Sequence, residues 1–180
     1  MNSKGLSTYL TSNLEIEPTE LVSIVENYAV REVAKEEYLL QPNEYCSAIF
    51  FVEKGLLRQF SLDEKGKEHI LAFAPENWFV TDRESSYFNK PSRYYIQALE
   101  DTRVAVLDNG FIQKMSHKFP AFANFNTMLL HNNIRSLQNR INLLLSASAE
   151  DRYLQFIKMY PDILLRVPQS MVASYLGIAP

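Results

Sequence analysis

The sequence has one cysteine, Cys46, among its 180 residues. A single thiol cannot form an internal disulfide, and it cannot supply the thiolates of a zinc cage or of an iron–sulfur cluster. No stretch approaches the roughly 18 uncharged apolar residues that span a membrane, and the polar start at residues 1–5 lacks the apolar core of a secretion signal. We therefore expect a cytoplasmic protein with no membrane partner, in which Cys46 is a small buried strand residue.

Residues that carry enzymatic chemistry are also scarce. Neither a Gly-rich phosphate loop nor the serine turn of the hydrolases is present. The three histidines are His69, His117 and His131, and the last two fall on predicted helices, whereas a metal-dependent enzyme of the cupin type needs clustered histidines and a carboxylate. We expect no catalytic residues, no metal site and no cofactor, and we keep a cupin-like enzyme as a minor alternative.

The charge is divided unevenly along the chain. Residues 1–108 hold 11 Lys and Arg against 18 Asp and Glu, a net charge of −7, whereas residues 109–180 hold 7 against 3, a net charge of +4. Positive charge in the second part favours contact with phosphates. A solvated surface would show the same pattern.

The first part of the chain combines two helical segments with a run of short strands. We expect helices at Lys4–Asn13 and after Pro18, where Leu21, Val22, Ile24 and Val25 are apolar. Short β-prone runs separated by turn signals then suggest a jelly-roll-like β-roll. These runs are Val30–Val33, Ala48–Val52, Leu56–Leu62, His69–Phe73, Tyr94–Leu99 and Val104–Leu107.

The second part is predicted to be helical throughout. A short helix ends near Phe119, because the residue before Pro120 is steered out of the helical region, and a long helix follows at about 120–145. Apolar residues recur along it with the alternating spacing of a coiled-coil seam, which predicts a homodimer. The alternative is that the seam packs against the chain's own β-roll, where a further face with Leu129, Leu143 and Leu145 could also lie. The seam residues are Leu130, Ile134, Leu137, Ile141 and Leu144.

Residues 146–180 are predicted to form a second, small helical domain, after a first domain at residues 1–145. A joint at 146–148 precedes a helix that Ser148 caps, with Asp151 three positions on. Pro168 then opens a helix that ends at Gly177, a position that favours glycine, and residues 179–180 begin another. This is the pattern of a helix-turn-helix whose second helix is cut off at its beginning. An ordinary core helix followed by glycine is the alternative.

Taken together, these features resemble the Crp/Fnr family of transcription regulators. The order of a β-roll, a long dimerising helix and a terminal helix-turn-helix matches along nearly the whole chain. Local matches are Ser61–Trp78 and Tyr95–Thr102 in the roll, Glu150–Tyr153 at the joint, and Val167–Ser170 with Leu176–Ile178 in the terminal motif.

The resemblance also implies where a ligand would bind. In members that bind cyclic nucleotides, a Gly-Glu pair and an Arg-Ser pair form a phosphate cassette, and the matching positions here are Thr81-Asp82 and Ser92-Arg93. The glycine is lost and the arginine is displaced by one residue, which along a strand turns its side chain to the other face. Cyclic nucleotide is therefore not expected, and another small ligand is left open. Asp82 and Arg93 could instead be strand residues joined by a surface ion pair.

The sequence thus predicts an α+β protein: a jelly-roll-like β-roll, a long dimerisation helix and a small winged-helix-type domain truncated after the first helix of its helix-turn-helix. We expect a dimeric transcription regulator rather than an enzyme, with Gln169 and Ser170 contacting DNA phosphates and base reading left to residues after Pro180. Its implied partners are DNA, a second copy and RNA polymerase. The alternative is a ligand-binding or interaction module without sequence-specific DNA binding.

Overall fold

The computed structural model describes residues 5–14, 17 and 28–178. The chain divides into two compact units, residues 1–61 with 71–126 and residues 62–70 with 127–180. The predicted boundary between a sensor and a DNA-binding domain at residues 145 and 146 stays a prediction.

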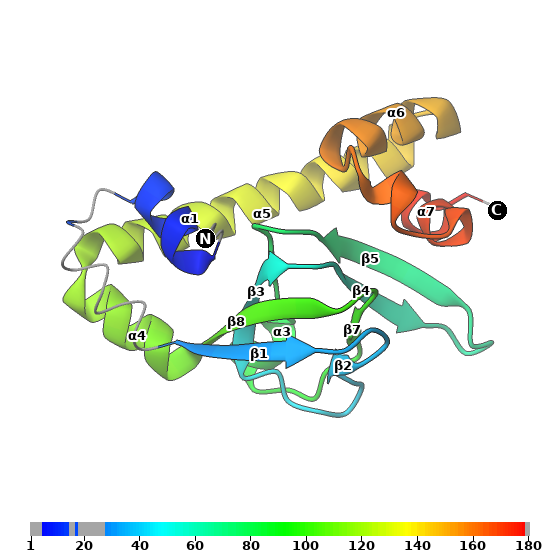
Figure 1. Cartoon of the computed structure of the whole chain (residues 1–180). Coiled ribbons are helices and arrows are strands. Elements are labelled where there is room, and N and C mark those ends of the chain that lie inside the picture. Colours follow the sequence, from blue (N-terminus) through cyan, green and yellow to red (C-terminus); the bar gives the residue numbers. More distant parts are fainter. Residues whose placement is uncertain (1–4, 15–16, 18–27, 179–180) are drawn as a thin grey trace. The chain divides into compact units, whose positions relative to one another are not determined.

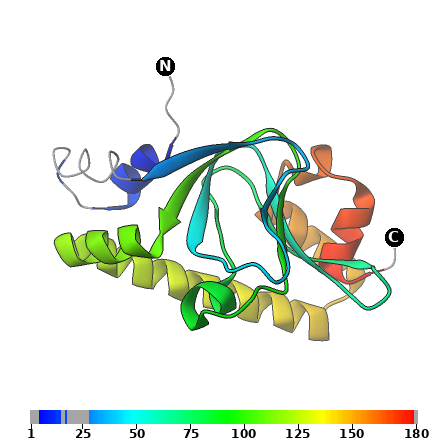
Figure 2. The same ribbon diagram turned by 90° about the horizontal axis from the view of Figure 1, so that it is seen from below.

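The first unit is built on two antiparallel sheets that enclose one apolar core (Figures 1 and 2). One sheet has the order β1 (Ala29–Val33), β8 (Thr102–Asp108), β3 (Ala48–Lys54), β6 (Phe79–Val80). The other has the order β2 (Tyr38–Leu40), β7 (Tyr95–Ala98), β4 (Leu57–Leu62), β5 (Glu68–Ala74). Side chains from both sheets fill the space between them. These core side chains include Val33, Phe50, Val52, Leu57, Ile96 and Val104. The predicted β-roll is confirmed.

All six predicted strands are present, and three further elements were missed. Strands β2 and β6 have three and two residues, too few to show an alternating pattern. The third is a short helix, α3 (Arg83–Phe88). Cys46 is buried as predicted, but the prediction of a strand position was wrong, because it lies in the loop before β3.

Helices at both ends of the first unit were predicted correctly. Helix α1 (Leu6–Asn13) places Tyr9 against the rings of Phe51 and Phe79, with centroids 5.0 and 5.6 Å away. Helix α4 (Asn109–Lys118) is capped by Asp108 and ends before Pro120, where α5 (Pro120–Ser146) begins. The predicted helix after Pro18 lies outside the described residues.

The second unit contains residues 62–70, from the end of β4 to the start of β5, and most of α5. It also contains helix α6 (Ala149–Met159), a 3-10 turn η1 (Ile163–Leu165) and helix α7 (Gln169–Leu176). Rings of Phe156, Tyr160 and Tyr175 contact one another in its interior. The predicted capping of α6 is confirmed, since Ser148 Oγ accepts a hydrogen bond from the Asp151 amide at 3.1 Å. Within the described residues, no helix is both long enough and apolar enough to cross a membrane.

The turn after α7 also has the predicted form. Gly177 adopts a left-handed conformation with φ of 66°, and its amide and that of Ile178 donate to the carbonyls of Ser174 and Ala173. These two bonds satisfy carbonyls at the end of the helix, as in the Schellman motif. The start of the next helix, at residues 179–180, lies outside the described residues.

Candidate ligand and nucleic-acid sites

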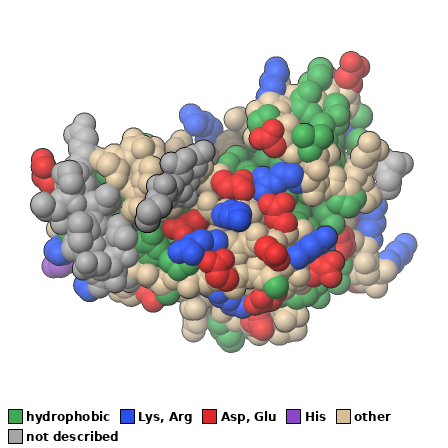
Figure 3. Space-filling model, in the orientation of Figure 1, with side chains coloured by type: hydrophobic (Ala, Val, Ile, Leu, Met, Phe, Trp, Pro, Cys, Tyr) green, Lys and Arg blue, Asp and Glu red, His purple; other side chains and the backbone are tan. Residues whose placement is uncertain are grey.

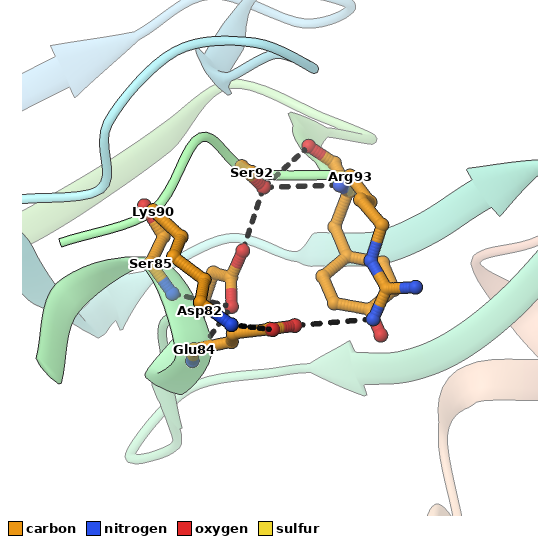
Figure 4. A network of polar contacts seen from close by, with 7 residues as sticks. Asp82, Glu84, Ser85, Lys90, Ser92 and Arg93 are labelled. Atoms are coloured by element: carbon orange, nitrogen blue, oxygen red, sulfur yellow. Dashed lines mark hydrogen bonds and ion pairs between the residues drawn. The ribbon is translucent and has the colours of Figure 1, made fainter. Parts of the chain in front are cut away.

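Asp82 is the centre of the polar network at the predicted phosphate cassette (Figure 4). Asp82 is the residue directly before α3, and its Oδ1 accepts hydrogen bonds from the amides of Glu84 at 3.0 Å and Ser85 at 3.2 Å. Asp82 is only 3% exposed. A buried carboxylate at a helix start is stabilised by the unpaired amides of the first turn, so the chain itself supplies the anion for this helix end.

Ser92 completes the network from the other side. Its Oγ donates to Asp82 Oδ2 at 2.7 Å and accepts from the Tyr94 amide at 3.0 Å. The backbone of Ser92 is held as well, because its amide donates to the Glu44 carbonyl at 2.8 Å. Two of the four predicted ligand residues, Asp82 and Ser92, therefore lie together and bond directly.

Arg93 lies outside this network. Its guanidinium is 74% exposed and pairs with Glu84 at 3.1 Å, and Lys90 pairs with the same carboxylate at 3.3 Å. Hydrogen bonds from Lys90 and then Arg93 lower the pKa of Glu84 below its usual value. The alternative of an Asp82–Arg93 ion pair between strand residues was wrong, because Asp82 caps α3 and Arg93 lies in the loop before β7.

Thr81, the fourth predicted residue, bonds to the neighbouring strand. Its Oγ1 donates to the Ala48 carbonyl at 2.9 Å and lies 3.5 Å from Cys46 Sγ. Next to it, Arg83 is exposed overall, and partial desolvation of its guanidinium lowers the pKa of that group. The contacts of Thr81 are internal, and they explain how the segment before α3 is attached to the roll.

A buried arginine on the second sheet was missed by the sequence reasoning. Arg58 on β4 stands opposite Gln97 on β7, its Nε donates to Gln97 Oε1 at 2.9 Å, and its guanidinium lies 4.1 Å from the centre of the Phe60 ring. Side chains alternate along β4, so Arg58 and Phe60 lie on the face opposite Leu57, which is in the core. A charged residue inside an apolar run was the only available signal.

The outer face of the first sheet carries mixed charges. Figure 3 shows Lys and Arg side chains interleaved with Asp and Glu over these strands. Arg103 on β8 bonds to Glu32 on β1 at 2.7 Å and to the largely buried Glu53 on β3 at 3.0 Å. Charges of both signs at such spacing do not form a phosphate-binding surface.

Metal-binding side chains are not gathered in the described residues. They contain no group of three or more His, Cys, Asp or Glu side chains that could hold a metal ion. His69 contacts Asp63 in the β4–β5 turn, 3.2 Å away, and both are partly exposed. The clustered histidines that a cupin-like enzyme requires are thus not assembled in this part of the chain.

The predicted DNA contacts lie at the start of α7. Gln169 and Ser170 are the first two residues of the helix, and both are exposed. Pro168, which precedes them, makes no side-chain cap, so the start of α7 has no capping carboxylate of the kind that Asp82 supplies to α3. The Met171 amide donates to the Pro168 carbonyl at 3.0 Å. A helix start of this kind attracts anions.

The predicted dimer seam is an exposed apolar stripe on α5. Leu130, Ile134, Leu137, Ile141 and Leu144 all belong to the exposed large hydrophobic residues. Exposed apolar stripes on one helix face are typical of association surfaces. Leu145, on the further apolar face of this helix, is 82% exposed.

Comparison with known proteins connects these features. Residues 30–118 match the family described as "Cyclic nucleotide-binding domain". Regulatory protein HlyX of Actinobacillus pleuropneumoniae is 26% identical over 144 residues, which cover 79% of this chain and 58% of that protein. The anaerobic regulatory protein of Haemophilus influenzae is 24% identical over 175 residues, which cover 91% of this chain and 66% of that protein.

A solved structure shows the same fold. FixK2 from Bradyrhizobium japonicum superimposes with a TM-score of 0.71 at 19% identity, over 84% of this chain and 78% of that one. The chain spans between about half and two thirds of the length of the curated relatives it matches. Both relatives described above are regulatory proteins by name, which agrees with the prediction that the chain is not an enzyme.

Proposed function

Because this chain belongs to the Crp/Fnr family, with a cyclic nucleotide-binding domain at residues 30–118, we propose that it is a cytoplasmic transcription regulator that acts as a dimer. In this proposal the β-roll senses a small ligand, and the helices that follow α5 contact DNA. A ligand would act by binding one dimer geometry more tightly than another. RNA polymerase is a further partner that the family implies.

The observation that carries the DNA proposal is the form of α7. The helix ends in the Gly177 turn, and it begins at the exposed residues Gln169 and Ser170 without a side-chain cap. In a helix-turn-helix the first helix crosses the phosphate backbone, and phosphates are stabilised at a helix start. These residues would position the protein, and base reading would come from the helix after the turn.

The dimer proposal is supported by the exposed seam on α5. Five large apolar side chains at heptad spacing are exposed on this helix. Pairing with the same stripe of a second copy would remove them from water, which is favourable by about 25 cal/mol per Å² of apolar surface. A two-fold pair of α5 helices would then present two copies of α7 to two DNA half-sites.

For the β-roll, we propose that a cyclic nucleotide is not the ligand. The amides that begin α3 already bind the Asp82 carboxylate, and Ser92 bonds to the same group. Arg93 pairs with Glu84 at the surface instead of pointing to this helix end. A phosphate placed here would meet the buried Asp82 charge without a facing guanidinium, and this is unfavourable.

The regulator proposal is tested on the natural protein. A short epitope added at the chromosomal gene allows its DNA to be recovered after cross-linking. We expect enrichment at a small number of discrete sites upstream of genes, and loss of that enrichment when Gln169 and Ser170 are both replaced by Glu. Recovery of no discrete sites would overturn the proposal and favour the alternative, a ligand-binding or interaction module without sequence-specific DNA binding.

A further inference from the structure

Strand β5 is the last strand of its sheet, yet part of its open edge is covered within the second unit. An edge strand presents unpaired amides and carbonyls. The Ile70 amide of β5 donates to Ser174 Oγ on α7 at 3.1 Å, and the same hydroxyl donates to the Glu68 carbonyl at 2.8 Å. The Ser174 hydroxyl thus bonds to one amide and one carbonyl of β5 that would otherwise pair with a neighbouring strand.

Arg140 on α5 binds the next group along the same edge. Its Nη2 donates to the Ile70 carbonyl at 2.9 Å and to the Tyr175 carbonyl at 3.0 Å. The guanidinium also lies 4.0 Å from the centre of the Tyr175 ring, close enough for a cation–π interaction. Three separate segments, α5, β5 and α7, therefore meet at Arg140 and Ser174. The parts that meet, which include residues 68–70 of β5, belong to one compact unit.

The turn between β4 and β5 is itself held firmly. Asp63 Oδ1 accepts hydrogen bonds from the amides of Lys65 and Lys67, both at 2.9 Å. Gly66 supplies a left-handed residue with φ of 78°, and its amide donates to the Asp63 carbonyl at 2.9 Å. A turn closed by this many local bonds behaves as a stiff connection rather than a loose loop.

From these contacts we propose that Arg140 and Ser174 are positioning residues that fasten α7 to the β4–β5 hairpin, so that hairpin and helix move together. The strands of the hairpin continue into the sheet that contains β7. A change in that sheet then reaches α7 through β4 and β5, in addition to any route along α5. We call the contacts of Arg140 and Ser174 with β5 and α7 the clasp. The clasp rests on the proposed function only in giving α7 a role on DNA.

The chemistry of the clasp explains which substitutions it tolerates. A hydroxyl both donates and accepts, so Thr can replace Ser174, whereas Ala removes the bonds of that hydroxyl to the Glu68 carbonyl and the Ile70 amide. The planar guanidinium of Arg140 reaches two carbonyls while stacking on a ring, and a neutral glutamine cannot do both. The two sites thus offer a conservative and a disruptive replacement.

The clasp is tested by amide hydrogen exchange on the full chain. In Ser174→Ala and in Arg140→Gln we expect the Ile70 amide and the amides of α7 to exchange about five- to tenfold faster, since a net hydrogen bond contributes about 1 kcal/mol. Ser174→Thr should retain the natural rates. The Ala105 amide in β8 reports on the first unit and should not change.

A second experiment tests whether loosening the β4–β5 turn changes the amide exchange rates of α7. Asp63→Ala loosens the turn, and Glu64→Ala, an exposed neighbour, is the matched control. We expect faster exchange in α7 for Asp63→Ala alone. Unchanged α7 rates in Asp63→Ala, or in Ser174→Ala, would overturn the clasp. Neither arm uses DNA, so a failed clasp is distinguishable from a failed regulator proposal.

Discussion

The hydroxyl of Ser92 donates to the carboxylate of Asp82 at 2.7 Å and joins the loop before β7 to the start of α3. These two residues are ten positions apart in sequence. Both are buried, and the bond ties the two ends of the segment that corresponds to the family's phosphate cassette. The bonds of Asp82 bear on the stability of the protein and on the binding of cyclic AMP.

Asp82→Ala is expected to destabilise the protein. It removes the cap of α3 and leaves the Ser92 hydroxyl without its acceptor, which together cost about 1–3 kcal/mol. Urea denaturation measures the free energy of unfolding. Glu84→Gln, which removes only exposed ion pairs of the same helix, is the control and should lose much less. Equal losses for the two variants would mean that the network around Asp82 contributes little.

Titration of cyclic AMP into the natural protein is expected to show no saturable heat at millimolar concentration. The reason is that the Asp82 carboxylate already occupies the α3 amides, and like charge repels the phosphate. Isothermal calorimetry gives the result directly. Saturable binding that disappears in Arg93→Gln would show that Arg93 turns inward to hold the nucleotide, contrary to our proposal.

Glu53→Ala is expected to loosen the attachment of α1. Glu53 is 7% exposed and accepts hydrogen bonds from the Leu6 amide at 3.0 Å, from Tyr28 at 3.2 Å and from Arg103 at 3.0 Å. Removing this shared acceptor should cost about 1–3 kcal/mol by urea denaturation. Glu32→Ala also removes a partner of Arg103, but at an exposed position, and should cost about 0–1 kcal/mol. The reverse order would contradict the role given to Glu53.

Stability is expected to fall at alkaline pH through Tyr28. Burial, followed by the Glu53 charge and hydrogen bond, raises the pKa of Tyr28 from 10.0 to about 12. A raised pKa in the folded state means that the stabilisation is complete below pH 10 and is lost as the pH rises towards 12. The free energy of unfolding should therefore fall more steeply between pH 10 and 12 for the natural protein than for Tyr28→Phe. Parallel curves would exclude this contribution.

Ile134→Asp is expected to convert the dimer to a monomer. Ile134 lies in the middle of the exposed seam, where a carboxylate would be desolvated on pairing. Sedimentation equilibrium distinguishes the two masses. Asn132→Asp places the same charge on the same helix at an exposed position on the face opposite the seam and should leave the dimer intact. A natural protein that sediments as a monomer would refute the dimer itself.

Much of the fold could be predicted because its signals are local. The strands around Phe50 and Val104 are short β-prone apolar runs between turn signals, and α5 shows a helical repeat. Ser148 and Gly177 mark helix ends within a few residues. Such patterns report on which atoms of a short segment can be buried or hydrogen-bonded together. Short elements such as β2, β6, α3 and η1 were missed because so few residues cannot establish a period.

The candidate site was predicted only in part, because its contacts join residues that are far apart in sequence. The positions of Asp82 and Ser92 could be found by resemblance, but their direct bond depends on α3, which the sequence pattern did not reveal. The same holds for Arg58 beside Gln97, where the strands of β4 and β7 must first pair in register. Arg93 shows the limit of the argument from strand alternation, since it lies in a loop.

The sequence by itself determined the order of the elements, the apolar seam and the turn that ends α7, because each follows from the preferences of neighbouring residues. Only the tertiary structure decided which polar groups meet. Ser174 binds the Ile70 amide across 104 positions of sequence, and no local pattern encodes that contact. Its partner is set by the packing of α7 against a strand edge, where a backbone group removed from water must find a hydrogen bond.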